Sequence, residues 1–171
     1  MHMETALGKS TIKTERLELR HFRAGDAVAL HPIFADPEAM RFWSSAPKSL
    51  AETEEFVRET IRARQAGTGD DFVVLFKGVV VGKAGLWRAN EIGFVFSPSV
   101  WGTGIASEAV RAIVSRASAR GVTSIIADVD PRNERCLRLL EKLGFVQTGA
   151  AKRTVLVGDE WADSVYLEAR V

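Results

Sequence analysis

Hydrophobic residues along the chain follow two different spacings, which predict an alternation of strands and helices. Between residues 11 and 20, Ile12, Leu17 and Leu19 alternate with polar positions, as in a half-buried strand. Residues 104–119 instead place apolar side chains at helical spacing. The predicted elements are, in chain order, a strand at 11–20, a short helix from Asp26 to Asp36-Pro37, a helix from Ser49 to Gly67–Gly69, strands at 71–76, 79–87 and 91–96, a helix at 104–119, a strand at 124–129, a helix at 133–143, a strand from Phe145 and a strand at 160–169.

The start of the second helix is the clearest boundary signal. Ser49-Leu-Ala-Glu52 has the spacing of a capping box, in which the two side chains bond to free backbone N–H groups. Helical spacing from that start predicts the following inner face: Leu50, Phe56, Val57, Thr60 and Ile61.

The order of elements predicts an α/β fold with one mixed sheet. The segment from 91 to 129 reads as strand, crossover helix and parallel strand, flanked by antiparallel hairpins. No repeat or Pro/Gly/Ser linker divides the 171 residues. We therefore expect a flexible lead-in at residues 1–10 and a single domain at 11–171.

Charge and composition argue against several classes of protein. The net charge of +1 argues against an extended nucleic-acid footprint or a polybasic membrane surface. The N-terminus lacks an apolar signal region and no apolar run approaches a membrane span, so a cytoplasmic location is expected. Cys136 is the only cysteine, and His2, His21 and His31 lack metal-ligand spacing. No disulfide or metal is expected.

A glycine-containing connection between a strand and a helix is the main candidate binding site. Gly102 and Gly104 allow backbone N–H groups to turn toward one point. The first-turn N–H groups of the following helix lack intrahelical partners, and the helix dipole favours an anion such as a pyrophosphate there. The structural alternative is that the glycines only tighten the connection.

Two nucleotide-binding motifs match this chain poorly. Residues 78–84 approach a P-loop but are one residue short and end in Ala84 instead of Ser or Thr. Residues 102–107 approach a dinucleotide fingerprint, with Asp128 as a ribose ligand, yet Ser107 occupies the third glycine position. Residues 97–101 also separate the strand from the first glycine, whereas a Rossmann strand runs almost directly into that turn.

Residues 91–109 resemble the acetyl-CoA motif of the GNAT superfamily of N-acetyltransferases, and its RimJ/RimL-type branch most closely. The superfamily pattern Gln/Arg-x-x-Gly-x-Gly/Ala maps to Trp101, Gly104 and Ala106. Trp101 departs from Gln or Arg, but Trp-Gly is common at this point in the RimJ/RimL-type branch. Residues 133–145 are similar to the second signature of the branch, Asn-x-x-Ser followed by Glu-Lys-x-Gly-Phe.

The resemblance continues outside these two motifs. Cys136 stands where the second signature has Ser, and residues 14–20 and 163–167 also resemble the branch. The likeness therefore spans nearly the whole chain.

The resemblance implies a cofactor site for acetyl-CoA where two central parallel strands splay apart. The main chain of Phe94, Val95 and Phe96 would pair with the pantetheine arm, and Asn133 would bond near it. Arg138 would contact a phosphate. The pyrophosphate would be held by Trp101, Gly102, Thr103, Gly104, Ile105, Ala106 and Ser107.

Acetyl transfer to a primary amine requires a neutral nitrogen, so a general base helps. Glu91 precedes the cofactor strand at a spacing that resembles the catalytic glutamate of histone-type members, although strand-start carboxylates are often simply exposed. A backbone N–H at Val95 or Phe96 is the expected oxyanion donor. Cys136 could protonate the thiolate, or could be a small hydrophobe on the face shared with Leu139.

The remaining candidates each have a structural alternative. Tyr166, the only tyrosine, could be the acid or an ordinary strand aromatic. In the family, the region of Phe42 and Trp43 borders the acceptor pocket, but both residues could be core. Asp163 could line that pocket or face solvent.

The acceptor expected from the resemblance is a protein N-terminal or small-molecule amine, and a homodimer is the default assembly. The alternative functions are a non-catalytic acyl-CoA-binding module and, on the glycine turn alone, a nicotinamide-cofactor enzyme.

Overall fold

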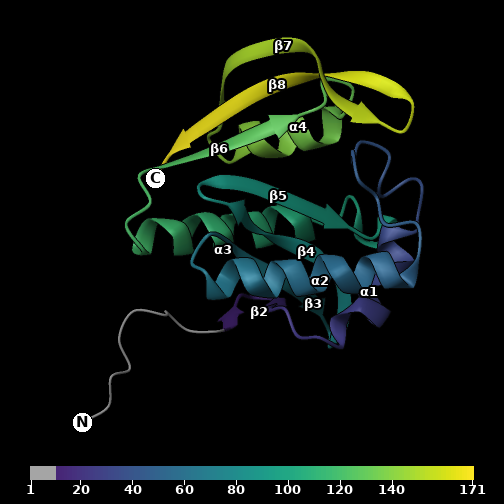
Figure 1. Ribbon diagram of the computed structural model, residues 1–171. Helices are drawn as coiled ribbons and strands as arrows, with labels where there is room; N and C mark the ends of the chain where they lie inside the picture. The colour runs from purple at the N-terminus through teal and green to yellow at the C-terminus, as the bar shows by residue number, and fades with distance from the viewer. Residues whose placement is uncertain (1–10) are drawn as a thin grey trace.

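The computed structural model describes residues 11–171 as one mixed eight-stranded sheet with helices on both faces (Figure 1). The predicted lead-in at residues 1–10 lies outside the described residues. The strands are β1 (Thr11–Lys13), β2 (Leu17–His21), β3 (Asp70–Phe76), β4 (Val79–Arg88), β5 (Glu91–Phe96), β6 (Ser124–Val129), β7 (Val146–Val157) and β8 (Glu160–Arg170). The helices are α1 (Asp26–Phe34), α2 (Leu50–Gln65), the 3₁₀ turn η1 (Pro98–Val100), α3 (Ile105–Ala119) and α4 (Glu134–Lys142).

The sheet order is β1-β2-β3-β4-β5-β6-β8-β7, and the pairing is antiparallel everywhere except between β5 and β6. The parallel pair is joined by the crossover helix α3, as the element order predicted. The predicted mixed α/β sheet is therefore confirmed. The glycine turn follows the carboxyl end of β5, and ligands of open α/β sheets bind outside the carboxyl ends of their strands.

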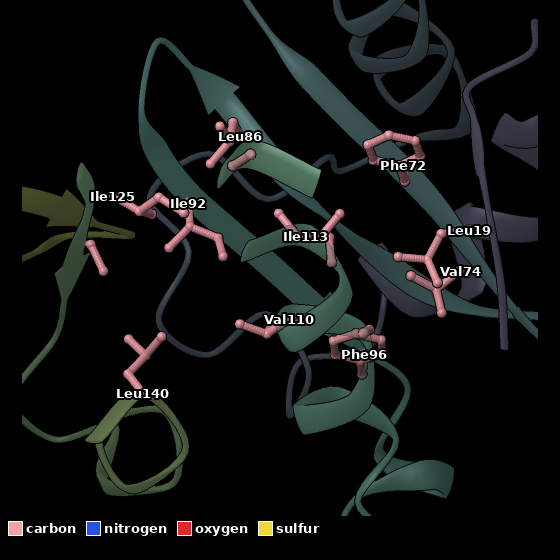
Figure 2. Packing of buried hydrophobic residues seen from close by; sticks show 14 of the residues in the cluster. Leu19, Phe72, Val74, Leu86, Ile92, Phe96, Val110, Ile113, Ile125 and Leu140 are labelled. Atoms are coloured by element: carbon pink, nitrogen blue, oxygen red, sulfur yellow. The ribbon is translucent and has the colours of Figure 1, made fainter. Parts of the chain in front are cut away.

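Two hydrophobic cores lie against the two faces of the sheet. Alternation along β3 sends Phe72 and Val74 into one core and Val73 into the other. The larger core includes α3 and α4, and Figure 2 shows Leu140 of α4 projecting toward Ile92 of β5. The smaller core includes α1 and α2. We call the sheet surface on the α1 and α2 side the second face.

Two predictions from local pattern were wrong. The expected strand at 11–20 is a hairpin of β1 and β2, because the Thr14 hydroxyl accepts a hydrogen bond from Leu17 N (3.0 Å) and closes a turn. Leu50 was predicted to face the core but is 41% exposed. Ser49 does cap α2 by accepting from Glu52 N (3.2 Å), so Leu50 is the first helical residue and lies beyond the core.

A carboxylate bonded to two arginines and a histidine ties β3 to β2 and α3. Asp70 binds Arg116 Nε (2.7 Å), Arg120 (2.8 Å) and His21 Nε2 (2.9 Å). Burial alone would raise the pKa of Asp70, but the hydrogen bonds and charges of these partners outweigh it and hold the pKa well below its usual range. A lowered folded-state pKa stabilises the fold above the unfolded value of about 3.9, and this stability is lost as the pH falls toward the folded value.

We therefore expect Asp70→Asn to lower the free energy of unfolding by about 2 kcal/mol at pH 7. The difference in stability between the wild type and Asp70→Asn should shrink below about pH 4. At these pH values the Asp70 carboxyl is protonated in the unfolded wild-type chain before it is protonated in the folded one. Urea unfolding of the wild type and of Asp70→Asn between pH 3 and pH 7 measures this difference. A deficit of the same size at pH 3 and pH 7 would contradict the ionic explanation.

Candidate active site

β5 and β6 pair at their amino ends and then separate, as Figure 1 shows. The one Cα pair between them is Glu91 with Ile126, and Ile126 N donates to Asn90 O (3.0 Å). Among the described residues, the rest of β5 has no ladder partner in β6. We call this region, from the Glu91–Ile126 pair to the carboxyl ends of both strands, the splay.

The alternating directions of the hydrogen bonds along β5 show which of its main-chain groups point toward the splay. Ser97 N donates to Val81 O of β4 (2.8 Å), whereas Asn90 O faces β6. Because successive residues of a strand alternate between its two edges, Phe94 and Phe96 face the splay and Val95 faces β4. Of the two groups predicted as the oxyanion donor, the N–H of Phe96 faces the splay and that of Val95 faces away from it.

The glycine turn presents a set of free backbone donors. Gly102 and Gly104 have φ angles of 74° and 80°, which glycine adopts without strain. Gly104 is the N-cap residue of α3 and has no side-chain cap, and the first helical bond runs from Glu108 N to Gly104 O (3.0 Å). Within residues 11–171, no protein group accepts from the backbone N–H groups of residues 102–107. Unpaired N–H groups at the start of a helix are of the kind that suits an anion.

Two arginines outside the predicted cofactor-binding residues lie at this turn. Arg16 donates to Thr103 O (2.9 Å), and one of its terminal nitrogens would be 3.3 Å from a Cβ at Gly104. Arg135 of α4 lies 3.9 Å from the centroid of the Trp101 ring. By contrast, Arg138, the predicted phosphate ligand, pairs with Glu134 (3.4 Å) on the exposed side of α4.

A carboxylate in the first turns of α3 holds Arg16 in place. Glu108 accepts hydrogen bonds from Thr14 Oγ1 (2.6 Å), Arg16 N (2.8 Å) and Arg16 Nε (2.6 Å). Burial alone would raise the pKa of Glu108, but these hydrogen bonds outweigh it and lower the pKa. The sequence predicts a strand in the 14–20 segment but not its contact with α3, because contacts between residues more than ninety positions apart leave no local signal.

Two of the predicted site residues, Asn133 and Cys136, have structural roles at the start of α4. Asn133 caps the helix, with Oδ1 accepting from Cys136 N (3.2 Å), which leaves its Nδ2 to donate elsewhere. Cys136 packs against the larger core, and burial raises the pKa of its thiol to about 12. Cys136 therefore stays protonated, and it is a weaker acid than an ordinary thiol with a pKa of about 8.5.

Glu91 and Tyr166 lie on the two sides of the splay. Glu91 begins β5 and its carboxylate accepts from Arg88 (2.8 Å), leaving the side chain 14% exposed. Tyr166 is a half-buried residue of β8 and is the Cα partner of Asp128 in β6. Asp128 is exposed and follows Ile126, the partner of Glu91, by two residues. The structure thus places Asp128 close to both Glu91 and Tyr166, beside the splay.

The predicted acceptor-site residues separate into different roles. Trp43 stacks on Phe34 with ring centroids 6.2 Å apart, as part of the smaller core. Phe42 lies 5.6 Å from the guanidinium of Arg132, at the carboxyl end of β6 and therefore beside the splay. Asp163 Oδ1 accepts from Arg153 N (2.9 Å), so this side chain supports an irregularity in β7.

Within residues 11–171, no cluster of His, Cys, Asp or Glu side chains has the arrangement of a metal site. In the same range, no helix combines the length and apolar character needed to cross a membrane.

Comparisons with known proteins agree with this geometry. The model of the acetyltransferase (GNAT) domain matches residues 16–146. The uncharacterized N-acetyltransferase YnaD of Bacillus subtilis (strain 168) is 28% identical over 163 residues, covering 91% of this chain and 94% of that protein.

Solved structures share the fold over nearly the full length. A GNAT-family acetyltransferase from Bacillus anthracis has a TM-score of 0.82 and 29% identity, covering 94% of this chain and 98% of that one. RimL, the ribosomal L7/L12 alpha-N-protein acetyltransferase, was solved in complex with coenzyme A. It has a TM-score of 0.86 and 20% identity, and the match covers 94% of this chain and 98% of RimL. The microcin C7 self-immunity acetyltransferase MccE, solved with acetyl-CoA and AMP, has a TM-score of 0.87 and 15% identity, covering 96% and 98%. From its sequence motifs, its splayed sheet and these matches, the chain belongs to the GNAT acetyltransferase family.

Proposed function

We propose that the protein transfers an acetyl group from acetyl-CoA to a primary amine by direct attack of the amine on the thioester. The observation that carries this proposal is the set of free backbone N–H groups at residues 102–107, next to the unpaired edge of β5. A diphosphate is an anion that the free N–H groups at the start of α3 can bind. An extended arm can pair with the unpaired edge of β5 as an added strand.

The cofactor would run from the glycine turn into the splay. The main chain of Phe94 and Phe96 would pair with the pantetheine arm, and the Nδ2 of Asn133 could bond to the same arm. Arg135, at the Trp101 ring, is better placed than Arg138 to neutralise a phosphate. MccE and RimL, whose structures contain acetyl-CoA or coenzyme A, support this choice of cofactor.

The reaction needs a proton acceptor for the amine and a proton for the departing sulfur. A carboxylate on the second face, near the splay, can serve as the acceptor. The raised pKa of Cys136 argues against that thiol as the proton donor, because its own thiolate would be a stronger base than the coenzyme A thiolate that it serves. Tyr166 is the donor that we propose.

The acceptor class that we propose is an α-amino group or a small-molecule amine. An α-amino group has a pKa of about 8 and is easier to deprotonate than a lysine-type amine with a pKa of about 10.4. RimL is named for acetylating the α-amine of a ribosomal protein, which supports including N-terminal peptides among the acceptors.

An assay of free thiol released from acetyl-CoA, across a panel of N-terminal peptides, polyamines and amino acids, tests this function. We expect amine-dependent thiol release, together with a rise in the melting temperature caused by acetyl-CoA and not by NAD. Stabilisation by acetyl-CoA with no release across the panel would favour a non-catalytic acyl-CoA-binding module. Stabilisation by NAD alone would contradict the proposal.

A further inference from the structure

Within the part of the chain that the structure describes, one area of the sheet surface beside the splay carries no packed helix. In β6, Ile125, Ala127 and Val129 are buried in the larger core, whereas Ile126 and Asp128 are exposed on the opposite, second face. The helices α1 and α2 on this face pack against β3 and β4. Ile126 is accordingly 40% exposed, so a substrate can approach β6 from this side.

The register places Asp128 level with the centre of the splay. Glu91 pairs with Ile126, so in a parallel pair Asp128 is level with Gly93, roughly 7 Å further along both strands. The side chains of the paired residues Glu91 and Ile126 lie on the second face. Gly93 and Asp128 each follow one of them by two residues, and positions two apart in a strand lie on the same face. Asp128 is therefore nearer than Glu91 to the level of Phe94, where the thioester arm is proposed to pair.

The strand opposite Asp128 has no side chain at this level. A Cβ at Gly93 would lie 3.1 Å from Trp87 Cδ1 and 3.7 Å from Lys83 Nζ, so glycine allows these two side chains to pack close to the main chain of β5 on this face. An amine can reach Asp128 from the exposed side of β6.

The two carboxylates near the splay differ in their partners. Glu91 accepts a hydrogen bond from Arg88 (2.8 Å). The Asp128 side chain makes no hydrogen bond or ion pair with any other residue among 11–171, and its cross-strand neighbour is Tyr166. The other titratable neighbour on this face of β8 is Glu168, which accepts from Ser124 Oγ (2.5 Å). Asp128 is the carboxylate free to meet an ammonium group.

We infer that Asp128, and not Glu91, is the catalytic proton acceptor for the amine; this rests on the proposed acetyltransferase function. Asp128 takes one proton from the ammonium and passes it to solvent. The neutral nitrogen forms a bond to the thioester carbon, and the carbon–sulfur bond breaks. The nitrogen gives up a second proton, and the sulfur gains one to leave as the free thiol.

The test compares Asp128→Asn with Glu91→Gln, and uses Asp159→Asn in the exposed turn between β7 and β8 as the matched control. The substrate is the amine of the panel that the wild type acetylates fastest. We expect Asp128→Asn to lower kcat about 100-fold or more. Glu91→Gln and Asp159→Asn should stay within about threefold of the wild type. Acetyl-CoA affinity, measured by calorimetry, should be unchanged in all three variants.

The pH profile separates proton transfer from a structural role. The deficit of Asp128→Asn in kcat/KM should narrow as the pH approaches the pKa of the amine, since the amine then loses its proton without help. A deficit that is constant with pH, an effect on KM alone, or wild-type activity in Asp128→Asn would overturn the inference and leave the acetyltransferase function standing. Absence of amine-dependent thiol release in the wild type would overturn both.

Discussion

Replacing Gly104 by valine is expected to weaken acetyl-CoA binding at least about 30-fold, equivalent to about 2 kcal/mol. Gly104 has a φ of 80°, a conformation that a β-branched residue adopts only with strain. A side chain there would also press on Arg16. The turn must therefore rearrange, and the N–H groups of residues 102–107 would no longer converge. Isothermal titration calorimetry with acetyl-CoA measures the change.

The opposite end of the same helix supplies the control. Gly121 follows the C-cap residue of α3 and has a φ of 85°, so Gly121→Val introduces a comparable backbone strain away from the turn. We expect Gly121→Val to be destabilised but to bind acetyl-CoA like the wild type. Equal affinity in both variants would contradict the assignment of the glycine turn as the phosphate site.

Replacing Lys83 by methionine is expected to lower the free energy of unfolding by about 3–5 kcal/mol. Lys83 is 1% exposed, and its Nζ lies 2.7 Å from Asp71 Oδ2 in the interior between the sheet and α2. The ammonium also lies 5.5 Å from the centroid of the Trp43 ring. Loss of the ammonium leaves the Asp71 carboxylate buried without a charge partner, which is far less favourable than losing both charges. Urea unfolding measures the effect.

The double variant Lys83→Met with Asp71→Asn should recover part of the loss, because it removes the unpaired charge. Arg58→Met provides the control for an exposed pair. Arg58 binds Glu55 (2.7 Å) with its side chain 50% exposed, so its removal should destabilise the fold far less than the removal of Lys83. A Lys83→Met variant no less stable than Arg58→Met would contradict the importance of the buried pair.

Periodic segments made much of the fold predictable. The helical spacing at 104–119 and the capping box at Ser49 each give a boundary without knowledge of the rest of the chain. The glycine turn was equally readable, because Gly102 and Gly104 meet a local conformational need that only a few residues satisfy.

Features made by distant residues were not predictable in this way. The contacts of Arg16 with Glu108 and of Arg135 with Trp101 depend on how β1, β2 and α4 are placed around α3. The position of Asp128 relative to Glu91 requires the register between β5 and β6, which alternation within one strand cannot supply. Leu50 was misplaced for a related reason, since helical spacing does not say where the core ends.

Amide-resolved hydrogen exchange with and without acetyl-CoA is the most direct test of the central claim, that a diphosphate binds the start of α3 while a thioester arm lies along β5. We expect acetyl-CoA to slow exchange at residues 102–107 and at Phe94 and Phe96, where the N–H groups have no protein partner in the splay or the turn. Unchanged exchange at these residues, with protection by acetyl-CoA appearing elsewhere, would contradict it.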